Sequence, residues 1–279
     1  MLAPALVLLF GLMIYPAFNA VYLSLTSTNL LALQRQTFIG LENFATILAD
    51  PTFYKSVVNT LIWTIGAVAF QLVFGMIGAL ALNQAIRLRG LIRGLVLLPW
   101  ATPSVLIALM WMWILDVNLG IANRLLEAVG LMAQPFLSGY DTALPTLIFI
   151  QVWQGIPFFA VMILAALQGV PHELVEAARI DGANAWHTFW RVVLPLIMPT
   201  VLITITLRLI WTANYFDLML ILTNGGPANA TLTLPLYAYQ TAYRGMDFGQ
   251  GAAMSVAQAI ALGFLVLLYM RQVRKSEIA

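Results

Sequence analysis

The stretch ELVEAARIDGANAWHTFWRVVLPLIMP, residues 173–199, places five charged side chains and a histidine in a chain that is otherwise strongly apolar. Over the whole chain, 62% of the residues are hydrophobic and 9% are charged, whereas soluble globular proteins carry about 25% charged residues. So few charges cannot cover the surface of a soluble protein of 279 residues. The composition therefore predicts a membrane protein in which residues 173–199 form a loop between spans.

Six apolar stretches reach the length of about 20 residues that a membrane-spanning helix needs. They are Leu2–Leu25, Ser56–Asn83, Leu95–Leu115, Ala143–Leu167, Val192–Leu222 and Ala252–Met270. The first could also be a signal peptide, but its apolar run is too long, Pro16 interrupts it and no basic segment precedes it. We therefore expect a span there. The missing basic start is explained if the numbered chain lacks a few native N-terminal residues.

The basic residues are sorted between the two sets of loops. One set contains eight of the 13 Lys and Arg residues, namely Arg87, Arg89, Arg93, Arg179, Arg191, Arg271, Arg274 and Lys275. The opposite set contains four, namely Arg35, Lys55, Arg124 and Arg244. Because short cytoplasmic loops are enriched in Lys and Arg, the first set is expected in the cytoplasm together with both termini. The loop around residues 173–199 then lies between the fourth and fifth spans on the cytoplasmic side.

This loop has the pattern of two short helices. Proline suits the first turn of a helix, so Pro171 predicts a helix start, and Gly182 permits a break. Asn184 is a candidate cap for a second helix that leads into Leu194-Pro195. The end of the first helix has small residues, which would let the surface of another molecule approach closely. These are Ala177, Ala178, Gly182 and Ala183, and the acidic residues Glu173, Glu176 and Asp181 flank them. The residues alone fit either docking to a partner or an amphipathic loop on lipid headgroups.

Polar side chains within the spans are candidates for a transport path, because an ionisable residue in a membrane is costly and usually functional. At helical spacing one face of the fifth span contains Thr204, Arg208, Trp211 and Tyr215. One face of the fourth span contains Gln151, Gln154 and Phe158. Amides and aromatic rings suit a sugar, although glutamines bridging helices and aromatics filling the interior explain the same pattern. Asp217 is expected near the opposite side of the helix from Arg208, bonded to a neighbouring helix or a gate.

The sequence offers no pattern for catalysis. It contains no cysteine and no G-x-x-x-x-G-K-[ST] phosphate loop. His172 and His187 lack other ligands at metal spacing, and Glu176 and Asp181 do not converge on one helix face. The net charge of +2 is too small to indicate nucleic-acid binding. We therefore expect neither catalytic residues nor a metal site.

The spacing from Glu176-Ala177-Ala178 through Gly182 and Val192 to Leu194-Pro195 resembles the EAA loop of binding-protein-dependent ABC importer permeases. The departure is Val192, where Ile is usual. Other stretches resemble the carbohydrate-uptake branch, with its maltose and glycerol-phosphate permeases: FIGLENF, DPTFYKSVVNT, LPWATPSVLIALMWMW, TNGGP and MDFGQGAAMSV. The resemblance implies an all-α membrane protein with six transmembrane helices and the type I importer permease fold. Its expected parts are 1–55 (first helix and outer segment), 56–271 (transmembrane core, with the coupling loop at 171–195) and 272–279 (cytoplasmic tail).

The resemblance also implies partners and roles. The loop would be the coupling helix, seated in one of two cytoplasmic ATPase subunits. Those subunits would bind ATP and Mg and hydrolyse the ATP. The chain itself would then be neither an enzyme nor a protein that binds a cofactor. Its other partners would be a second permease, a periplasmic or lipid-anchored sugar-binding protein, the sugar and membrane lipid, in the cytoplasmic (inner) membrane of a prokaryote. Sugar contacts in maltose-type relatives match positions Gln151, Gln154, Gly155, Phe158, Arg208, Trp211, Thr212 and Tyr215. The residue types mostly differ, which favours a different substrate.

Arg208 raises the question of substrate charge. Its cost at mid-membrane would be offset either by a carboxylate of the other permease or by a phosphate, sulfonate or carboxylate of the substrate. Two rival functions remain. An ion-driven secondary sugar transporter would need intramembrane carboxylates, for which Asp217 is the one candidate; an ABC permease for a non-sugar solute is disfavoured by the outer-loop patterns.

Overall fold

The computed structural model describes residues 3–29, 36–84 and 88–277. Leu2, at the expected start of the first span, Arg35, Arg87 and residues 278–279 of the expected tail lie outside the described residues. In chain order the elements are α1 (Ala3–Leu9), η1 (Phe10–Ile14), α2 (Tyr15–Ser24), β1 (Thr26–Ser27), β2 (Thr37–Phe38), α3 (Glu42–Ala49), α4 (Pro51–Leu82), α5 (Arg89–Ala101), α6 (Ser104–Ile114), α7 (Ile121–Ala128), α8 (Ala143–Gln168), α9 (His172–Ile180), α10 (Ala185–Thr188), η3 (Phe189–Val193), α11 (Leu194–Ala213), α12 (Asp217–Leu222), α13 (Leu234–Tyr239), η4 (Gln240–Arg244) and α14 (Phe248–Glu277). The η elements are single π-helical turns.

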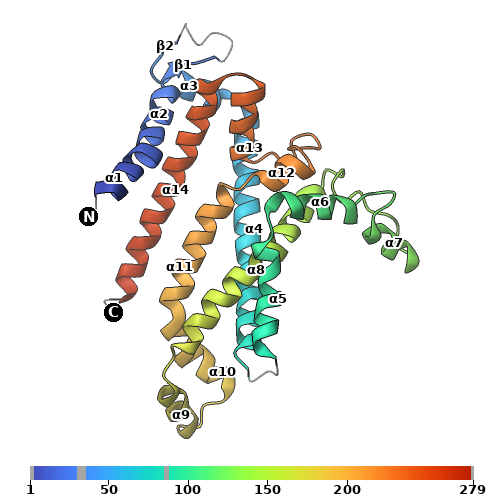
Figure 1. Ribbon diagram of the computed structural model, residues 1–279, viewed down its shortest axis with the longest axis vertical. Helices are drawn as coiled ribbons and strands as arrows, with labels where there is room; N and C mark the ends of the chain where they lie inside the picture. The colour runs from blue at the N-terminus through green and yellow to red at the C-terminus, as the bar shows by residue number, and fades with distance from the viewer. Residues whose placement is uncertain (1–2, 30–35, 85–87, 278–279) are drawn as a thin grey trace.

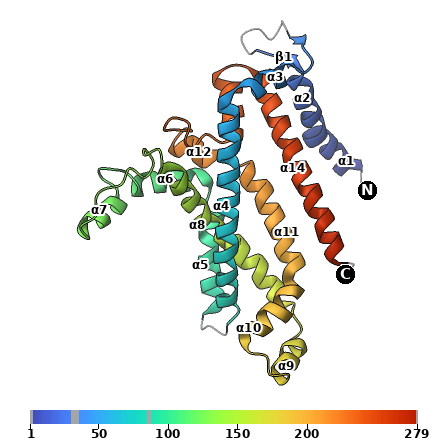
Figure 2. The same ribbon diagram turned by 180° about the vertical axis from the view of Figure 1, so that it is seen from behind.

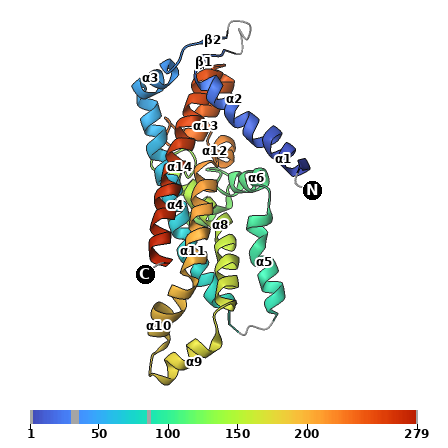
Figure 3. The same ribbon diagram turned by 90° about the vertical axis from the view of Figure 1, so that its left-hand side faces the viewer.

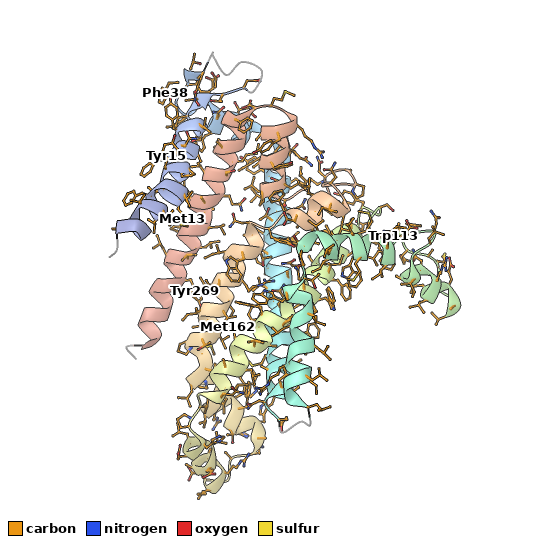
Figure 4. All side chains as sticks on the ribbon, in the orientation of Figure 1. Met13, Tyr15, Phe38, Trp113, Met162 and Tyr269 are labelled. Carbon is orange, nitrogen blue, oxygen red and sulfur yellow. The ribbon has the colours of Figure 1, made fainter. Side chains whose placement is uncertain are left out.

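The described chain is a helical bundle with a minimal antiparallel sheet of β1 and β2, in which Thr26 pairs with Phe38. Five helical stretches in it are long and apolar enough to cross a membrane, and α5 with α6 makes a sixth if the bent pair counts as one span. Large apolar side chains project from the sides of the bundle, among them Met13, Tyr15 and Trp113 (Figure 4). Such a surface suits lipid or partner helices rather than water.

The long helices α4 and α8 form the centre of the bundle (Figure 1). Gly75 of α4 lies so close to α8 that a Cβ at this position would collide with Phe159. In a bilayer, where lipid is as apolar as leucine, such small residues allow the close packing that holds helices together. Trp63 of α4 and Ile163 of α8 are fully buried on either side of this contact.

The third expected span, Leu95–Leu115, is broken in the structure. Its two parts, α5 and α6, are bent by 89°. Thr102 and Pro103, which join them, have extended backbone with ψ of 132° and 138°. Proline lacks an N–H and disfavours helical geometry in the residue before it, so the helix stops at Ala101 and restarts at Ser104. The α6–α7 segment then extends sideways from the bundle (Figures 1 and 2).

The fifth expected span, Val192–Leu222, is also interrupted, because α11 ends at Ala213 and α12 begins at Asp217. The break leaves a helix-terminal carbonyl that needs a hydrogen-bond partner. Gln258 of α14 supplies it, since its Nε2 donates to the carbonyl of Ala213 at 3.0 Å and to Oδ1 of Asn214 at 3.1 Å. A side chain 45 residues further along the chain thus stabilises the interruption.

The bundle has two distinct ends. Helices α9 and α10 protrude at one end, towards which the C-terminal part of α14 also points, while β1, α3 and the start of α14 lie at the other (Figures 1 and 3). The sixth expected span and the beginning of the tail are one helix, since α14 continues to Glu277. The first expected span is α1, η1 and α2, and none of its apolar window is buried against the rest of the chain.

Candidate functional site

A cavity of about 220 Å³ lies where the end of α5, the middle of α8 and the end of α11 meet. We call it the Arg208 cavity. Its lining consists of Trp100, Gln151, Gln154, Arg208, Trp211, Thr212 and Tyr215. The two helix breaks position part of this lining: Trp100 is the second-last residue of α5, just before the break at Thr102-Pro103, and Tyr215 lies within the break between α11 and α12.

Arg208 is 6% exposed and is held by a side chain of another helix. Its Nε donates to Oε1 of Gln71 on α4 at 3.0 Å. Gln71 is fully buried, and its Nε2 donates to the carbonyl of Gln151 on α8 at 2.7 Å. The guanidinium is therefore oriented by a chain of hydrogen bonds across three helices. Within the part of the chain that the structure describes, no carboxylate pairs with it.

Gly155 makes this arrangement possible. A Cβ at this position on α8 would collide with Nε2 of Gln71 and Nη2 of Arg208. The two polar side chains thus occupy the space beside α8 that a glycine leaves open. The resemblance placed Gly155 among the sugar-contact positions, whereas its visible effect here is to admit the Gln71–Arg208 pair.

Several polar atoms around the cavity have no hydrogen-bond partner among the described residues. They are Nη2 of Arg208, Oε1 of Gln151, Oε1 of Gln154, the hydroxyl of Tyr215 and Oγ1 of Thr212. Buried polar atoms are normally paired, because an orphaned one costs about 1–3 kcal/mol. One cationic donor, two amide acceptors and two hydroxyls therefore gather in one small space.

Aromatic rings form one wall. The ring centroid of Phe158 lies 5.8 Å from that of Trp100 and 5.3 Å from that of Trp211. The guanidinium carbon of Arg208 lies 5.8 Å from the centre of the Phe158 ring, within the range of a cation–π contact. Rings beside hydrogen-bonding groups are the combination that a polar, ring-shaped ligand requires.

The structure brings most of the predicted substrate residues together. Five line the cavity, namely Gln151, Gln154, Arg208, Trp211 and Tyr215, and Phe158 lies behind them through its ring contacts. Thr204 does not line the cavity: it is fully buried, and its hydroxyl donates to the carbonyl of Thr200 at 2.7 Å.

Sequence reasoning missed Gln71 and Trp100. A signal for Gln71 existed, since it is an amide in the middle of an apolar helix. Polar residues within a membrane span are costly and usually functional, as noted for Arg208. Trp100 had none, because its place depends on the bend at Pro103. Asp217 bonds to a neighbouring helix as expected, accepting a hydrogen bond from Ser104 of α6 at 3.0 Å.

The charged loop folds as two short helices, as the sequence predicted. In α9, Glu173, Glu176 and Ala177 are exposed, as are Asp181 and Gly182 beyond its end, whereas Ala178 and Ala183 are half-buried. Gly182 has φ of +82°, and nothing lies within 4 Å of where its Cβ would be. The side chain of Asn184 accepts from the backbone N–H of His187, which caps α10. Ile180 is 86% exposed, so the elbow presents an open surface with apolar and acidic groups.

The chain is similar to known transport proteins over most of its length. Residues 71–276 match the model of the family described as binding-protein-dependent transport system inner membrane component. The sulfoquinovosyl glycerol transport permease of Agrobacterium fabrum is 31% identical over 277 residues, covering 99% of this chain and 90% of that protein. The trehalose/maltose transport permease of Thermococcus litoralis is 30% identical, covering 97% and 91%.

Among solved structures, a bacterial ABC transporter involved in the import of the acidic polysaccharide alginate matches with a TM-score of 0.86. The match covers 99% of this chain and 94% of that chain at 23% sequence identity, and shows the type I importer permease fold. The family match over residues 71–276, together with the two permease relatives, excludes an ion-driven secondary transporter. With a family match over most of its length and relatives at 30% identity or more, the chain belongs to the inner membrane components of binding-protein-dependent transport systems.

Proposed function

We propose that this chain is one of two permease subunits of an ATP-driven sugar importer, and that the Arg208 cavity binds an anionic group of the sugar. The observation that carries the proposal is the buried guanidinium whose Nη2 has no partner among the described residues. Carboxylates, sulfonates and phosphates are the acceptors that a guanidinium binds best.

The magnitudes favour an anion over a neutral sugar. An arginine at the centre of a membrane costs about 2.5–3.5 kcal/mol on insertion scales. The hydrogen bond to Gln71 returns about 1.5–3 kcal/mol, but the orphaned Nη2 costs about 1–3 kcal/mol. An anionic group in the cavity would accept a hydrogen bond from Nη2 and also neutralise the guanidinium. A neutral hydroxyl would accept the hydrogen bond but leave the charge uncompensated. A carboxylate from the second permease could do both and is the alternative that the test must exclude.

The relatives support a sugar as the substrate class. The two similar permeases are named for sulfoquinovosyl glycerol and for trehalose and maltose, and the same fold serves the import of an acidic polysaccharide in the alginate transporter. Trp100 and Trp211, which line the cavity and are backed by Phe158, offer faces on which a pyranose ring can pack.

We further propose that α9 couples the membrane part to an ATPase. Its exposed acids and small residues at one end of the bundle support this assignment. The charged loop, the start of α5 and the C-terminal end of α14 lie towards the same end (Figure 1). This end would be cytoplasmic, with both termini on that side, and ATP and Mg would bind to the ATPase subunits. A binding protein would deliver the sugar at the opposite end.

Arg208→Met tests the substrate assignment. The readout is the ATPase activity of the reconstituted transporter when it is stimulated by its cognate binding protein, purified with its natural ligand. Removing one partner of a buried charge pair costs about 2–5 kcal/mol, so stimulation is expected to be lost while the complex still assembles. Arg124→Met, at an exposed arginine of α7 that lines neither cavity, is the matched control and should keep it. If the Arg208→Met complex falls apart, or a neutral ligand is still transported normally, the arginine is structural and the anionic substrate is wrong.

A further inference from the structure

A second cavity, of about 300 Å³, lies on the other side of the break between α11 and α12. We call it the Tyr239 cavity. Its lining includes Asn214, Phe216, Tyr239, Tyr243, Ser255 and Gln258. The three consecutive residues of the break divide between the cavities: Tyr215 lines the Arg208 cavity, while Asn214 and Phe216 line this one. The interruption of the span therefore serves two cavities at once.

Aromatic rings lie in a row, each tilted against the next, along one wall of the Tyr239 cavity. The centroids of Phe216 and Tyr239 are 5.4 Å apart with planes inclined by 33°, and those of Tyr239 and Tyr243 are 4.9 Å apart at the same inclination. Tyr243 is 58% exposed. The rings thus present a continuous aromatic surface that ends in an accessible tyrosine.

Fixed amides face this wall. Asn214 Nδ2 donates to the carbonyl of Ile210 at 2.8 Å, and Asn214 Oδ1 accepts from Gln258. Gln258 is 8% exposed and is anchored by its second bond, to Ala213. These amides are therefore held in place before any ligand arrives. All the residues that line the cavity are uncharged.

We propose that the Tyr239 cavity is a second sugar subsite, which binds an uncharged pyranose ring. The inference rests on the proposed function of the chain as a sugar permease. The apolar face of a pyranose packs on aromatic rings, while its hydroxyls pair with amides and phenols. A lipid acyl chain would gain nothing from the two amides, and an anionic unit would find no cation. Together the two cavities suit a glycoside that joins an anionic unit to a neutral one.

Saturation-transfer NMR on the assembled permease–ATPase complex in nanodiscs tests the subsite, with methyl α-glucopyranoside and glucuronate as probes. Ser255→Trp fills the cavity and Tyr243→Ala removes the accessible ring; both should abolish saturation of the glucoside. Tyr243→Phe keeps the ring, and Ala259→Trp places the same bulk one turn further along α14, outside the lining. Both of these variants should keep the glucoside signal.

The two proposals fail separately. Arg208→Met should abolish the glucuronate signal and leave the glucoside signal intact. If the wild-type complex gives no glucoside signal, or if Ser255→Trp leaves that signal unchanged, the second subsite is wrong, whether or not glucuronate still depends on Arg208. If Arg208→Met leaves glucuronate unaffected while Ser255→Trp abolishes the glucoside signal, the anion site fails and the second subsite stands.

Discussion

Arg208 of α11 and Gln71 of α4 are 137 residues apart in the chain and are joined by a hydrogen bond of 3.0 Å from Nε to Oε1. This contact uses the side of the guanidinium that faces α4 and leaves Nη2 without a partner among the described residues. Gln71 is therefore a positioning residue for the cation. Its own orientation is set by the bond from its Nε2 to the carbonyl of Gln151.

Gln71→Glu should convert the hydrogen bond into an ion pair. A carboxylate beside the guanidinium would neutralise it and compete with an anionic substrate, so stimulation by ligand-loaded binding protein should fall at least tenfold, a loss of about 1.4 kcal/mol or more. The complex should remain assembled, but the melting temperature should not rise, because the carboxylate gains an ion pair with Arg208 and loses the bond that Gln71 Nε2 donates to the carbonyl of Gln151. Normal stimulation in this variant would contradict an anion site at Arg208. Gln71→Leu removes the hydrogen bond without adding a charge. It should lower the melting temperature, because Nε of Arg208 would be left unpaired.

Gly155→Ala should disrupt the same pair by steric collision. The added Cβ would overlap Gln71 and Arg208, and both side chains would have to move from a closely packed site. Overpacking of this kind costs about 1–3 kcal/mol, and we expect loss of transport together with reduced thermal stability. Gly78→Ala is the control, because its Cβ would meet Ala160 at 3.4 Å, an ordinary contact. Equal behaviour of the two variants would show that the space beside Gly155 is not needed.

The coupling surface can be tested by adding bulk to α9. Gly182→Trp should uncouple transport, but its φ of +82° also strains any side chain there. Ala177→Trp avoids that strain, because Ala177 is an exposed helical residue. We expect the protein to insert normally but to lose ATPase co-purification and uptake in vesicles. Ala128→Trp, at an exposed position of α7 in the segment that extends sideways from the bundle, should change neither co-purification nor uptake. Normal uptake by Ala177→Trp would remove α9 from the ATPase contact.

The sequence predicted the helical class and the location of the spans because hydropathy over 20 residues is a strong local signal. Pro103, in the break between α5 and α6, is visible in the sequence, yet the 89° bend also depends on what the two halves pack against. The break after Ala213 had no comparable signal, since the amide that stabilises it comes from Gln258 on another helix. Gln71 was missed for the same reason: local periodicity places Arg208 on a face but does not show which helix opposes that face.

A polar contact at the N-terminal end of α4 predicts that the stability of the protein depends on pH. The hydroxyl of Tyr237 on α13 donates to the carboxylate of Asp50, the N-cap of α4. Burial raises the pKa of Asp50, but hydrogen bonds from Tyr237 and Thr52 outweigh it and leave this pKa below its ordinary value of 3.8. Burial and the bond to Asp50 raise the pKa of Tyr237 from 10.0 to about 12.

The signs follow from linkage. The contribution of Asp50 is present above pH 3.8 and is lost as the pH falls through its lowered pKa; that of Tyr237 is present below pH 10.0 and is lost as the pH rises towards 12. Tyr237→Phe should therefore destabilise the complex by about 1 kcal/mol at neutral pH, with little effect at either extreme, as measured by thermal unfolding. Tyr54→Phe loses a bond to the carbonyl of Leu48, an acceptor that does not titrate, so its effect should be the same at neutral and acidic pH. A Tyr237→Phe effect that is the same at every pH would contradict the charge-assisted bond.

The most direct measurement is an electron cryo-microscopy map of the complete transporter, trapped with its ligand-loaded binding protein and an ATP transition-state analogue. We expect ligand density in the cavity between Trp100 and Trp211, with an acidic group at hydrogen-bond distance, about 3 Å, from Nη2 of Arg208. A carboxylate of the second permease bound at that nitrogen instead, or a ligand seated away from it, would contradict the account.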